Sequence, residues 1–295
     1  MKLYNDIYNC IGEYLCIIER YKLTLICKES KQIFDIDREF RKQIINKLGE
    51  FMENANDFCI ELTKNKCVIS GSYILDCLYG TNNANDIDII KKIEIKDEDD
   101  EWFHQNNCHT GYSYDIDNGN LQVDNFIKYL HHMGAKEIYS TGKHKLTRCI
   151  LLNVRNYTIN NKKIQFIMIN QDIRKYIDYV FDMDICKNYF DGQKLYIKNL
   201  AKLMGKYDFY KPINSVAKYL YQPNNNNNIS NECRINKYIK RDFNIQKHKN
   251  FDYIENLVKK YVDTYKLSIL EQHHDDVIAE NFIQLYNILA DISKL

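Results

Sequence analysis

Residues 68–90 read VISGSYILDCLYGTNNANDIDII, and this stretch decides the fold. Cys67 to Ser70 form a short apolar strand pattern, which Gly71 ends. Ile74 to Tyr79 then predict a turn or two of helix. Asp86 to Ile90 alternate carboxylate and isoleucine, and this period of two is typical of a strand. The stretch therefore predicts a strand, a short helix and a second strand in close succession.

The two carboxylates of the second strand are candidate metal ligands. Side chains alternate along a strand, so Asp86 and Asp88 point to one face, while Ile87 and Ile89 point into the core and hold the strand rigid. Oxygen atoms are the ligands that Mg²⁺ prefers, and it usually takes one or two carboxylates together with nucleotide phosphates. The pattern predicts that Asp86 and Asp88 hold Mg²⁺ or Mn²⁺.

The turn before the short helix is a candidate phosphate site. Gly71 lacks a side chain, so its backbone can approach a phosphate closely. The Ser72 hydroxyl and the nearby amides lie where a helix begins, and such amides bind anions. We expect Gly71 and Ser72 to bind the triphosphate of a nucleotide.

These residues together resemble a known signature. Ile69-Ser70-Gly71-Ser72, followed after thirteen residues by Asp86-Ile87-Asp88-Ile89, is similar to the motif of DNA polymerase β-like nucleotidyltransferases. The resemblance implies an α+β fold with a mixed β-sheet flanked by helices. It also implies Mg²⁺-dependent attack of an acceptor hydroxyl on a nucleoside triphosphate, with release of pyrophosphate.

Most members of that family use a third carboxylate on a neighbouring strand. The natural place for it is Lys163 to Ile169, but Gln165 stands where the carboxylate is expected. Three alternatives follow: Asp182 or Asp184 supplies the group, two carboxylates suffice, or the protein has no activity. Asp184 is the predicted third catalytic carboxylate.

Two later stretches resemble tRNA nucleotidyltransferases and poly(A) polymerases of the same class. The segment from Phe181 to Lys187 is similar to a block that closes their nucleotide pocket, which implies nucleotide binding by Asp182 and Lys187. The alternative is a half-buried strand followed by an Asp-Gly turn. Arg234, Lys237 and Arg241 recur at helical spacing and suit triphosphate or RNA phosphates. A solvated basic helix face is the alternative interpretation.

The amino-terminal residues resemble an F-box, a helical hook that binds the adaptor Skp1. The similarity rests on apolar spacing, with Leu3, Ile7, Ile11, Tyr14 and Leu15 as its first members. The alternative is a helical cap packed on the catalytic domain. An F-box-like start joined to this core in an Asn-rich chain is similar to proteins of giant DNA viruses. The corresponding alternative function is a non-catalytic adaptor with a degenerate nucleotidyltransferase domain.

The chain is expected to have three parts: a helical segment at 1–36, a catalytic domain at 37–192 and a helical region at 193–295. The catalytic domain carries an acidic insertion near 96–119. Within it we expect four further elements: a helix from Asp37 to Leu62, a helix from Val123 to Gly134, a hairpin of Cys149 to Ile159 and Lys163 to Ile169 around Asn160-Asn161, and an alternating strand from Asp182 to Ile185.

Composition limits the function classes. Apolar residues make up 45% of the 295 residues and charged residues 27%, which suits a folded protein with a real core. The net charge of +1 gives no field that would by itself indicate nucleic-acid binding.

The ten cysteines include no CxxC pair, so a structural zinc site is not expected. Free thiols in a chain of this size predict a reducing compartment. The absence of a long apolar run predicts no membrane span and a cytoplasmic location. The acceptor, whether RNA, a protein or a small molecule, stays open.

Overall fold

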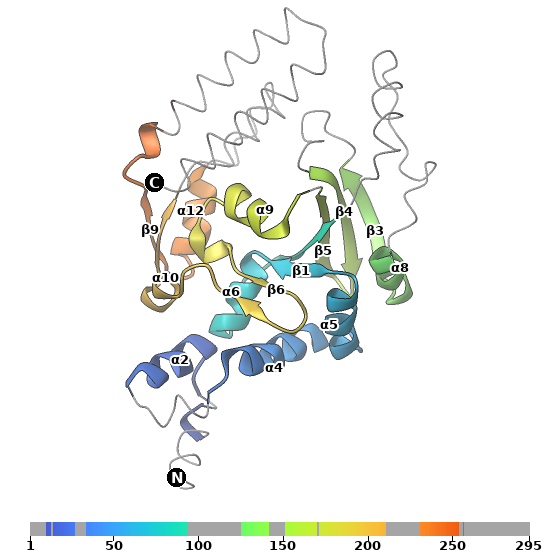
Figure 1. The fold of residues 1–295 in the computed structure, drawn as a ribbon, viewed down its shortest axis with the longest axis horizontal. Coiled ribbons are helices and arrows are strands. Elements are labelled where there is room, and N and C mark those ends of the chain that lie inside the picture. Colours follow the sequence, from blue (N-terminus) through green and yellow to red (C-terminus); the bar gives the residue numbers. More distant parts are fainter. Residues whose placement is uncertain are drawn as a thin grey trace, which may run out of the picture.

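The computed structural model describes residues 10–12, 14–26, 34–93, 125–141, 151–169, 171–210, 231–253 and 256. A mixed sheet runs through the middle of these residues, with helices around it (Figure 1), which confirms the predicted α+β class. Its strand order is β3-β4-β5-β2-β1-β6-β7. The strands are β1 (Cys67–Ser70), β2 (Asp86–Lys92), β3 (Lys136–Thr141), β4 (Leu151–Ile159), β5 (Lys162–Ile169), β6 (Tyr189–Phe190) and β7 (Leu195–Tyr196). β2 pairs with β5 in parallel, and the other neighbours pair antiparallel.

The helices cover both faces of the sheet. They are α2 (Ile17–Ile26), α4 (Ile36–Gly49), α5 (Ala55–Lys64), α6 (Ser72–Tyr79), α8 (Asn125–His132), α9 (Ile173–Val180), α10 (Leu200–Gly205) and α12 (Asn231–Ile239), with a 3₁₀ turn η2 (Asp184–Cys186). One apolar cluster joins α4, α5, α6 and α8 to Ile69, Ile87 and Ile89. A smaller cluster joins α9 to Val68 and Ile90 on the opposite face.

The two apolar clusters, on opposite faces of the sheet, show on which face the carboxylates of β2 lie. Ile87 and Ile89 are fully buried in the larger core, while Asp86 and Asp88 are half-buried. Asp86 and Asp88 alternate with these isoleucines and share the strand face of Ile90, which packs near α9. The predicted alternation is confirmed, and the carboxylates lie on the α9 face of the sheet.

The predicted helix from Asp37 to Leu62 is wrong, because the chain forms two helices there. α4 ends at Gly49, a poor helix former, and Asn54 precedes α5. Phe40 on α4 and Phe58 on α5 are both fully buried in one core. The turn between the helices brings both apolar faces onto that core, which one straight helix would not do.

Two turns follow the sequence closely. Asn160 and Asn161 have φ of 45° and 67° and join β4 to β5 as a tight hairpin. Gly134 has φ of 80° just after α8, as expected of a glycine that ends a helix.

Two other expectations are wrong. Asp182 to Ile185 form no strand; the chain makes the 3₁₀ turn η2, and the Ile185 amide donates to the Asp208 carboxylate over 2.8 Å. The region after Lys194 is not helical throughout, because β8 (Tyr207–Tyr210) and β9 (Asn244–Lys247) pair in parallel. β3 was not predicted. The expected acidic insertion at 96–119 lies outside the described residues.

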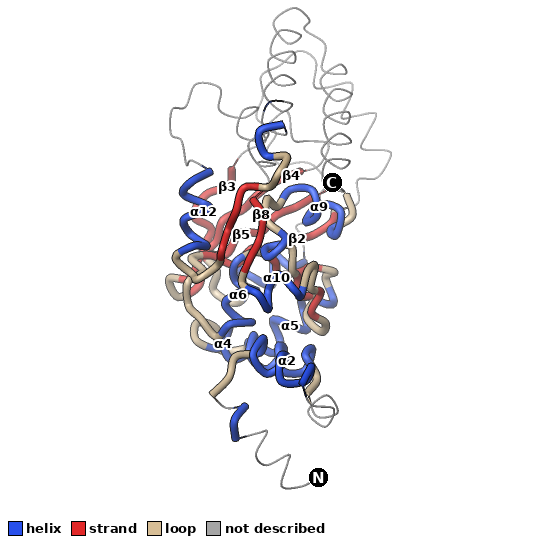
Figure 2. Tube along the Cα trace, turned by 90° about the vertical axis from the view of Figure 1, so that its left-hand side faces the viewer, coloured by secondary structure: helices blue, strands red, loops and turns tan. Residues whose placement is uncertain are grey.

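The described part of the amino-terminal region packs as a cap. α2 contacts α4, α6 and α10 at one end of the molecule (Figures 1 and 2), and its Ile17 and Ile18 belong to the main core. Its far side leaves Leu25 and Ile26 63% and 81% exposed. Leu3 and Ile7 of the F-box resemblance lie outside the described residues.

No helix in the described ranges is long and apolar enough to cross a membrane. The cysteines of those ranges, among them Cys59, Cys77 and Cys186, form no disulfide.

Candidate active site

Asp86 and Asp88 line a pocket of about 150 Å³, and the Gly71-Ser72 turn lines it as well. Its other lining residues are Gly71, Ser72, Gln165, Phe181, Lys237 and Tyr238. Segments far apart in the sequence therefore meet here: the start of α6, β2, β5, the end of α9 and α12. The structure brings together five of the predicted site residues, which are Gly71, Ser72, Asp86, Asp88 and Lys237.

Gly71 is required by both conformation and space. Its φ of 78° and ψ of −153° lie in a region that is almost restricted to glycine. A Cβ atom at this position would collide with Oδ2 of Asp88. The missing side chain thus lets the Asp88 carboxylate lie directly against the start of α6. Ser72, the first residue of that helix, is 6% exposed and lines the same pocket.

Gln165 occupies the place beside Asp88 where a third carboxylate was expected. The two residues are register partners on the parallel strands β2 and β5, and both line the pocket. The Gln165 amide donates to Oδ1 of Asn156 over 3.1 Å, and Asn156 is itself buried on β4. This contact fixes a neutral side chain next to the carboxylate pair.

The structure does not bring Asp184 to the pair. Its carboxylate binds Lys202 Nζ at 2.5 Å and Lys187 Nζ at 3.4 Å, and Lys202 also binds Asp208 at 2.6 Å. Among the residues that the structure describes, no three or more His, Cys, Asp or Glu side chains gather as a metal site. Asp184 begins η2 and is joined through Lys202 to α10 and to Asp208 of β8.

Two other predicted nucleotide ligands are buried outside the pocket. Asp182 is 3% exposed and Lys187 is 5% exposed, and neither lines the cavity. The ammonium group of Lys187 forms an ion pair with Asp184. From this segment, the pocket receives the neighbouring ring of Phe181.

The predicted basic face of α12 divides into two roles. Lys237 lines the pocket, with its Nζ 5.8 Å from the centroid of the Tyr238 ring. Arg241, just after the helix, turns away and donates from Nη2 to the backbone oxygen of Asn83. Arg234 lies on α12, and its side chain is not described.

The loop that leads to Asp86 is held from several sides. Lys47 Nζ donates to the Thr81 oxygen over 2.6 Å, and Lys162 Nζ donates to the Ala84 oxygen over 2.6 Å. Asp76 accepts from the Thr81 hydroxyl over 2.7 Å and from the Ala84 amide over 2.5 Å. The loop before β2 is therefore held by hydrogen bonds to side chains of α4, β5 and α6.

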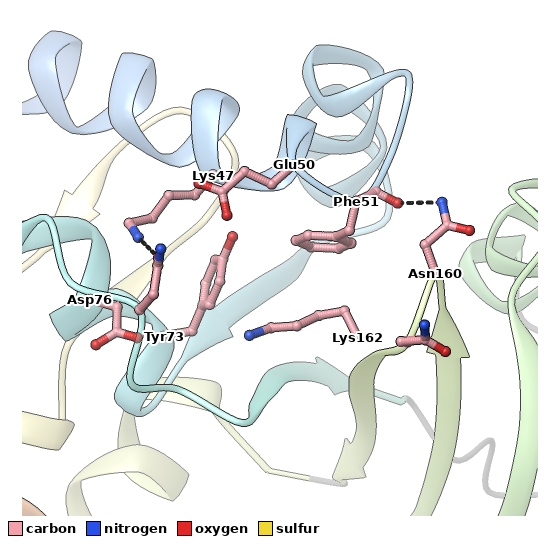
Figure 3. Close-up of a pocket in the computed structure, with 9 residues that line it drawn as sticks. Lys47, Glu50, Phe51, Tyr73, Asp76, Asn160 and Lys162 are labelled. Carbon is pink, nitrogen blue, oxygen red and sulfur yellow. Dashed lines mark hydrogen bonds between the residues drawn. The ribbon is translucent and has the colours of Figure 1, made fainter.

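Figure 3 shows Lys47, Asp76 and Lys162 at a second cavity of about 280 Å³, which is separate from the carboxylate pocket. Tyr73 stands in the middle of the view with its ring beside Lys162, whose Nζ lies 5.7 Å from the ring centroid. Burial raises the pKa of Tyr73 well above its ordinary value. Lys47 and Lys162, which both line this cavity, donate to carbonyl groups of the loop at 81–84.

The donor set of the carboxylate pocket fits Mg²⁺. Asp86 and Asp88 offer hard oxygen ligands from one strand face, and Mg²⁺ commonly takes its remaining ligands from water and substrate phosphates. Gly71 and Ser72 stand beside the pair, where those phosphates would lie. Asp86 and Asp88 are the residues that would hold the metal.

The sequence pointed to the segment that begins at Phe181 but to no role for that ring, and it did not single out Tyr238 as a pocket residue or Asn156 as the partner of Gln165. An aromatic residue between Lys237 and Arg241 was the available signal for Tyr238, because aromatic rings among basic residues suit nucleotide binding. Asn156 had no local signal, since its contact depends on the pairing of β4 with β5.

No model of a known protein family matches the chain, and no curated protein matches it. A solved structure of a tRNA-processing enzyme in its apo form I is similar to 82% of this chain, with 14% identity and a TM-score of 0.37. The chain spans 56% of that enzyme. The resemblance to an F-box finds no support in these comparisons.

Proposed function

We propose that the protein is a Mg²⁺-dependent nucleotidyltransferase that uses a nucleoside triphosphate. One observation carries the proposal: Gly71, Ser72, Asp86, Asp88 and Lys237 converge on a single pocket although they come from separate elements. A glycine turn at a helix start, two carboxylates on one strand face and a facing ammonium group are the parts that triphosphate binding needs.

The proposed reaction joins an acceptor hydroxyl to the α-phosphorus of the nucleotide. The new bond forms between the acceptor oxygen and that phosphorus, the acceptor hydroxyl gives its proton to water, and the bond to the bridging oxygen breaks as pyrophosphate leaves. Bound Mg²⁺ supplies charge neutralisation on the phosphates. The residues of the chain position the reactants: Asp86 and Asp88 fix the metal, the start of α6 receives phosphate oxygens and Lys237 balances their charge. RNA is one acceptor that the basic α12 suits, and a protein hydroxyl is another.

Gln165 favours a second candidate, which is binding of the nucleotide without turnover. An amide carries no negative charge and is not a general base at neutral pH, so the pair at Asp86 and Asp88 lacks the expected third carboxylate. In that case the domain would serve as a nucleotide-binding or adaptor module, with a Skp1-type adaptor as its candidate partner.

Binding is tested by thermal unfolding with each nucleoside triphosphate and Mg²⁺ or Mn²⁺. We expect one triphosphate to raise the Tm by about 5 °C or more at roughly a hundred times its Kd. The double variant Asp86→Asn, Asp88→Asn should keep its fold and lose the shift. An equal shift in the variant would remove these carboxylates from the site.

Turnover is tested with labelled triphosphates, Mg²⁺ and parallel RNA and protein acceptors. Incorporation of label by the wild type, lost in the double variant, supports the transferase. Gln165→Asp separates the candidates, because it places a carboxylate beside Asp88. A wild type that binds without transferring label, and a Gln165→Asp variant that transfers it, would identify the binding module.

A further inference from the structure

Arg241 connects α12 to the loop before the carboxylate strand. Its Nη2 donates to the backbone oxygen of Asn83, and the centre of its guanidinium lies 5.4 Å from the centroid of the Tyr238 ring. Arg241 does not line the pocket, whereas Lys237 and Tyr238 do. The guanidinium therefore joins the segment that carries Lys237 and Tyr238 to the loop at Asn83.

That loop is a rigid point of attachment. Lys47 and Lys162 already hold the carbonyl groups of Thr81 and Ala84, on either side of Asn83. Asp86, three residues after Asn83, begins β2. A group fastened to Asn83 is thus fastened to the start of the metal-binding strand.

Tyr238 also contacts Cys186, and this contact offers a way to detect movement of α12. The Cys186 thiol lies 3.1 Å from the Tyr238 hydroxyl, and Cys186 is 5% exposed. Phe243 packs edge-on against both Tyr238 and Tyr79, with ring centroids 6.4 Å and 5.5 Å apart. Movement of α12 away from the pocket would uncover the Cys186 thiol.

We propose that Arg241 is a positioning residue that fastens α12 to the loop at Asn83 and so holds Lys237 and Tyr238 against the carboxylate pocket. Where it concerns the nucleotide, this role rests on the proposed function. Loss of the fastening leaves the carboxylates in place but lets the opposite wall of the pocket move.

The fastening is tested without ligand by the rate at which a thiol reagent labels Cys186, followed by peptide mass spectrometry. Arg241→Ala should raise that rate about tenfold, which is the low end of what a hydrogen bond from a charged donor contributes, because this contact is exposed. The fully buried Cys77 reports global unfolding, and the exposed Cys233 on α12 reports reagent access. Both should be labelled as in the wild type.

Two further variants separate positioning from a general effect on α12. Arg241→Lys keeps a charged donor and should restore most of the slow labelling of Cys186. Lys240→Ala changes an exposed neighbour and should leave the rate unchanged. An unchanged Cys186 rate in a folded Arg241→Ala protein would overturn the proposal. Rapid labelling of Cys77 in Arg241→Ala would mean that this variant unfolds, and Arg241→Lys then gives the test. A Cys186 labelling rate in Arg241→Lys as slow as that of the wild type supports the proposal.

The nucleotide arm uses MgATP, MgCTP, MgGTP and MgUTP in turn. If the wild type binds one of them, Arg241→Ala should weaken binding about tenfold and the ligand should slow its Cys186 labelling again. Weaker binding with unchanged labelling would make Arg241 a direct ligand of the nucleotide instead. If no triphosphate binds the wild type, the proposed function fails, while the labelling rates still decide the fastening.

Discussion

At the scale of single residues, Gly71 and Gly80 form a matched pair at the two ends of α6. Both have positive φ, of 78° and 68°, but a Cβ at Gly71 would collide with the Asp88 carboxylate, while nothing lies within 4 Å of one at Gly80. Gly80→Ala should cost about 1 kcal/mol, which is the usual cost of a left-handed alanine.

Gly71→Ala should cost about 2–3 kcal/mol, because its backbone region is nearly restricted to glycine and the carboxylate must move. It should also weaken MgNTP binding, which Gly80→Ala should leave unchanged. Chemical denaturation and the ligand-induced Tm shift measure the two effects. Equal losses in both variants would mean that the contact between Gly71 and Asp88 has no part in the site.

At the scale of elements, Lys202 joins η2, α10 and β8 through two carboxylates. Burial alone would lower the pKa of Lys202, but the hydrogen bonds that it donates to Asp184 and Asp208 raise that pKa above its ordinary value of 10.5. Burial raises the pKa of Asp208, and the Lys202 hydrogen bond offsets part of this rise. Lys202 thus compensates charge that the fold buries.

Lys202→Met should therefore destabilise the protein by about 3 kcal/mol near neutral pH, since it leaves the buried Asp208 carboxylate without its ammonium partner and Asp184 with Lys187 alone, at 3.4 Å. A lysine with a raised pKa contributes its full stability below the unfolded pKa of 10.5 and loses it as the pH rises through the higher folded value. The wild type should lose stability in that alkaline range more steeply than Lys202→Met. Urea titrations from pH 7 to about pH 11 check both expectations, and parallel pH curves would contradict them.

At the scale of the whole molecule, the main core runs from α2 through the sheet to Phe243 and Phe251 near the other end of the described chain. Ile18 of α2 is 1% exposed, while Ile26 on the same helix is 81% exposed. Ile18→Asp should cost about 4 kcal/mol or more and promote aggregation, because it buries a charge. Ile26→Asp should leave the Tm nearly unchanged and, if Skp1 binds this outer face, abolish that binding. Tm and light scattering measure the first pair of effects, and similar Tm values for both variants would show that α2 is not part of the core.

The sequence predicted the features that depend on near neighbours. The alternation at Asp86 to Ile90 and the Asn160-Asn161 turn follow from local backbone geometry, and both are present. The features it missed depend on distant partners. The 3₁₀ turn at Asp184 is held by Asp208, and the parallel pair β8–β9 joins segments separated by α12.

The same limit applies to the candidate site. Gly71, Ser72, Asp86 and Asp88 lie close in sequence, and their spacing indicated the pocket. Basic spacing on α12 placed Arg241 with the phosphate ligands, whereas its guanidinium binds Asn83. A spacing rule shows which side chains share a helix face, but not which backbone oxygen lies opposite.

The parallel pairing of β2 with β5 has a consequence for the newly made chain. β2 leaves the ribosome with its antiparallel neighbour β1, but α8, β3 and β4 must be synthesised before β5 arrives, and α12 comes later still. Long-range parallel pairs form slowly, because a large loop must close first. Until then, Asp86 and Asp88 sit on an unpaired strand edge, where their charge opposes pairing with other chains. Since Gln165 and Tyr238 line the same cavity, nucleotide capture would begin only after nearly the whole described chain has been made.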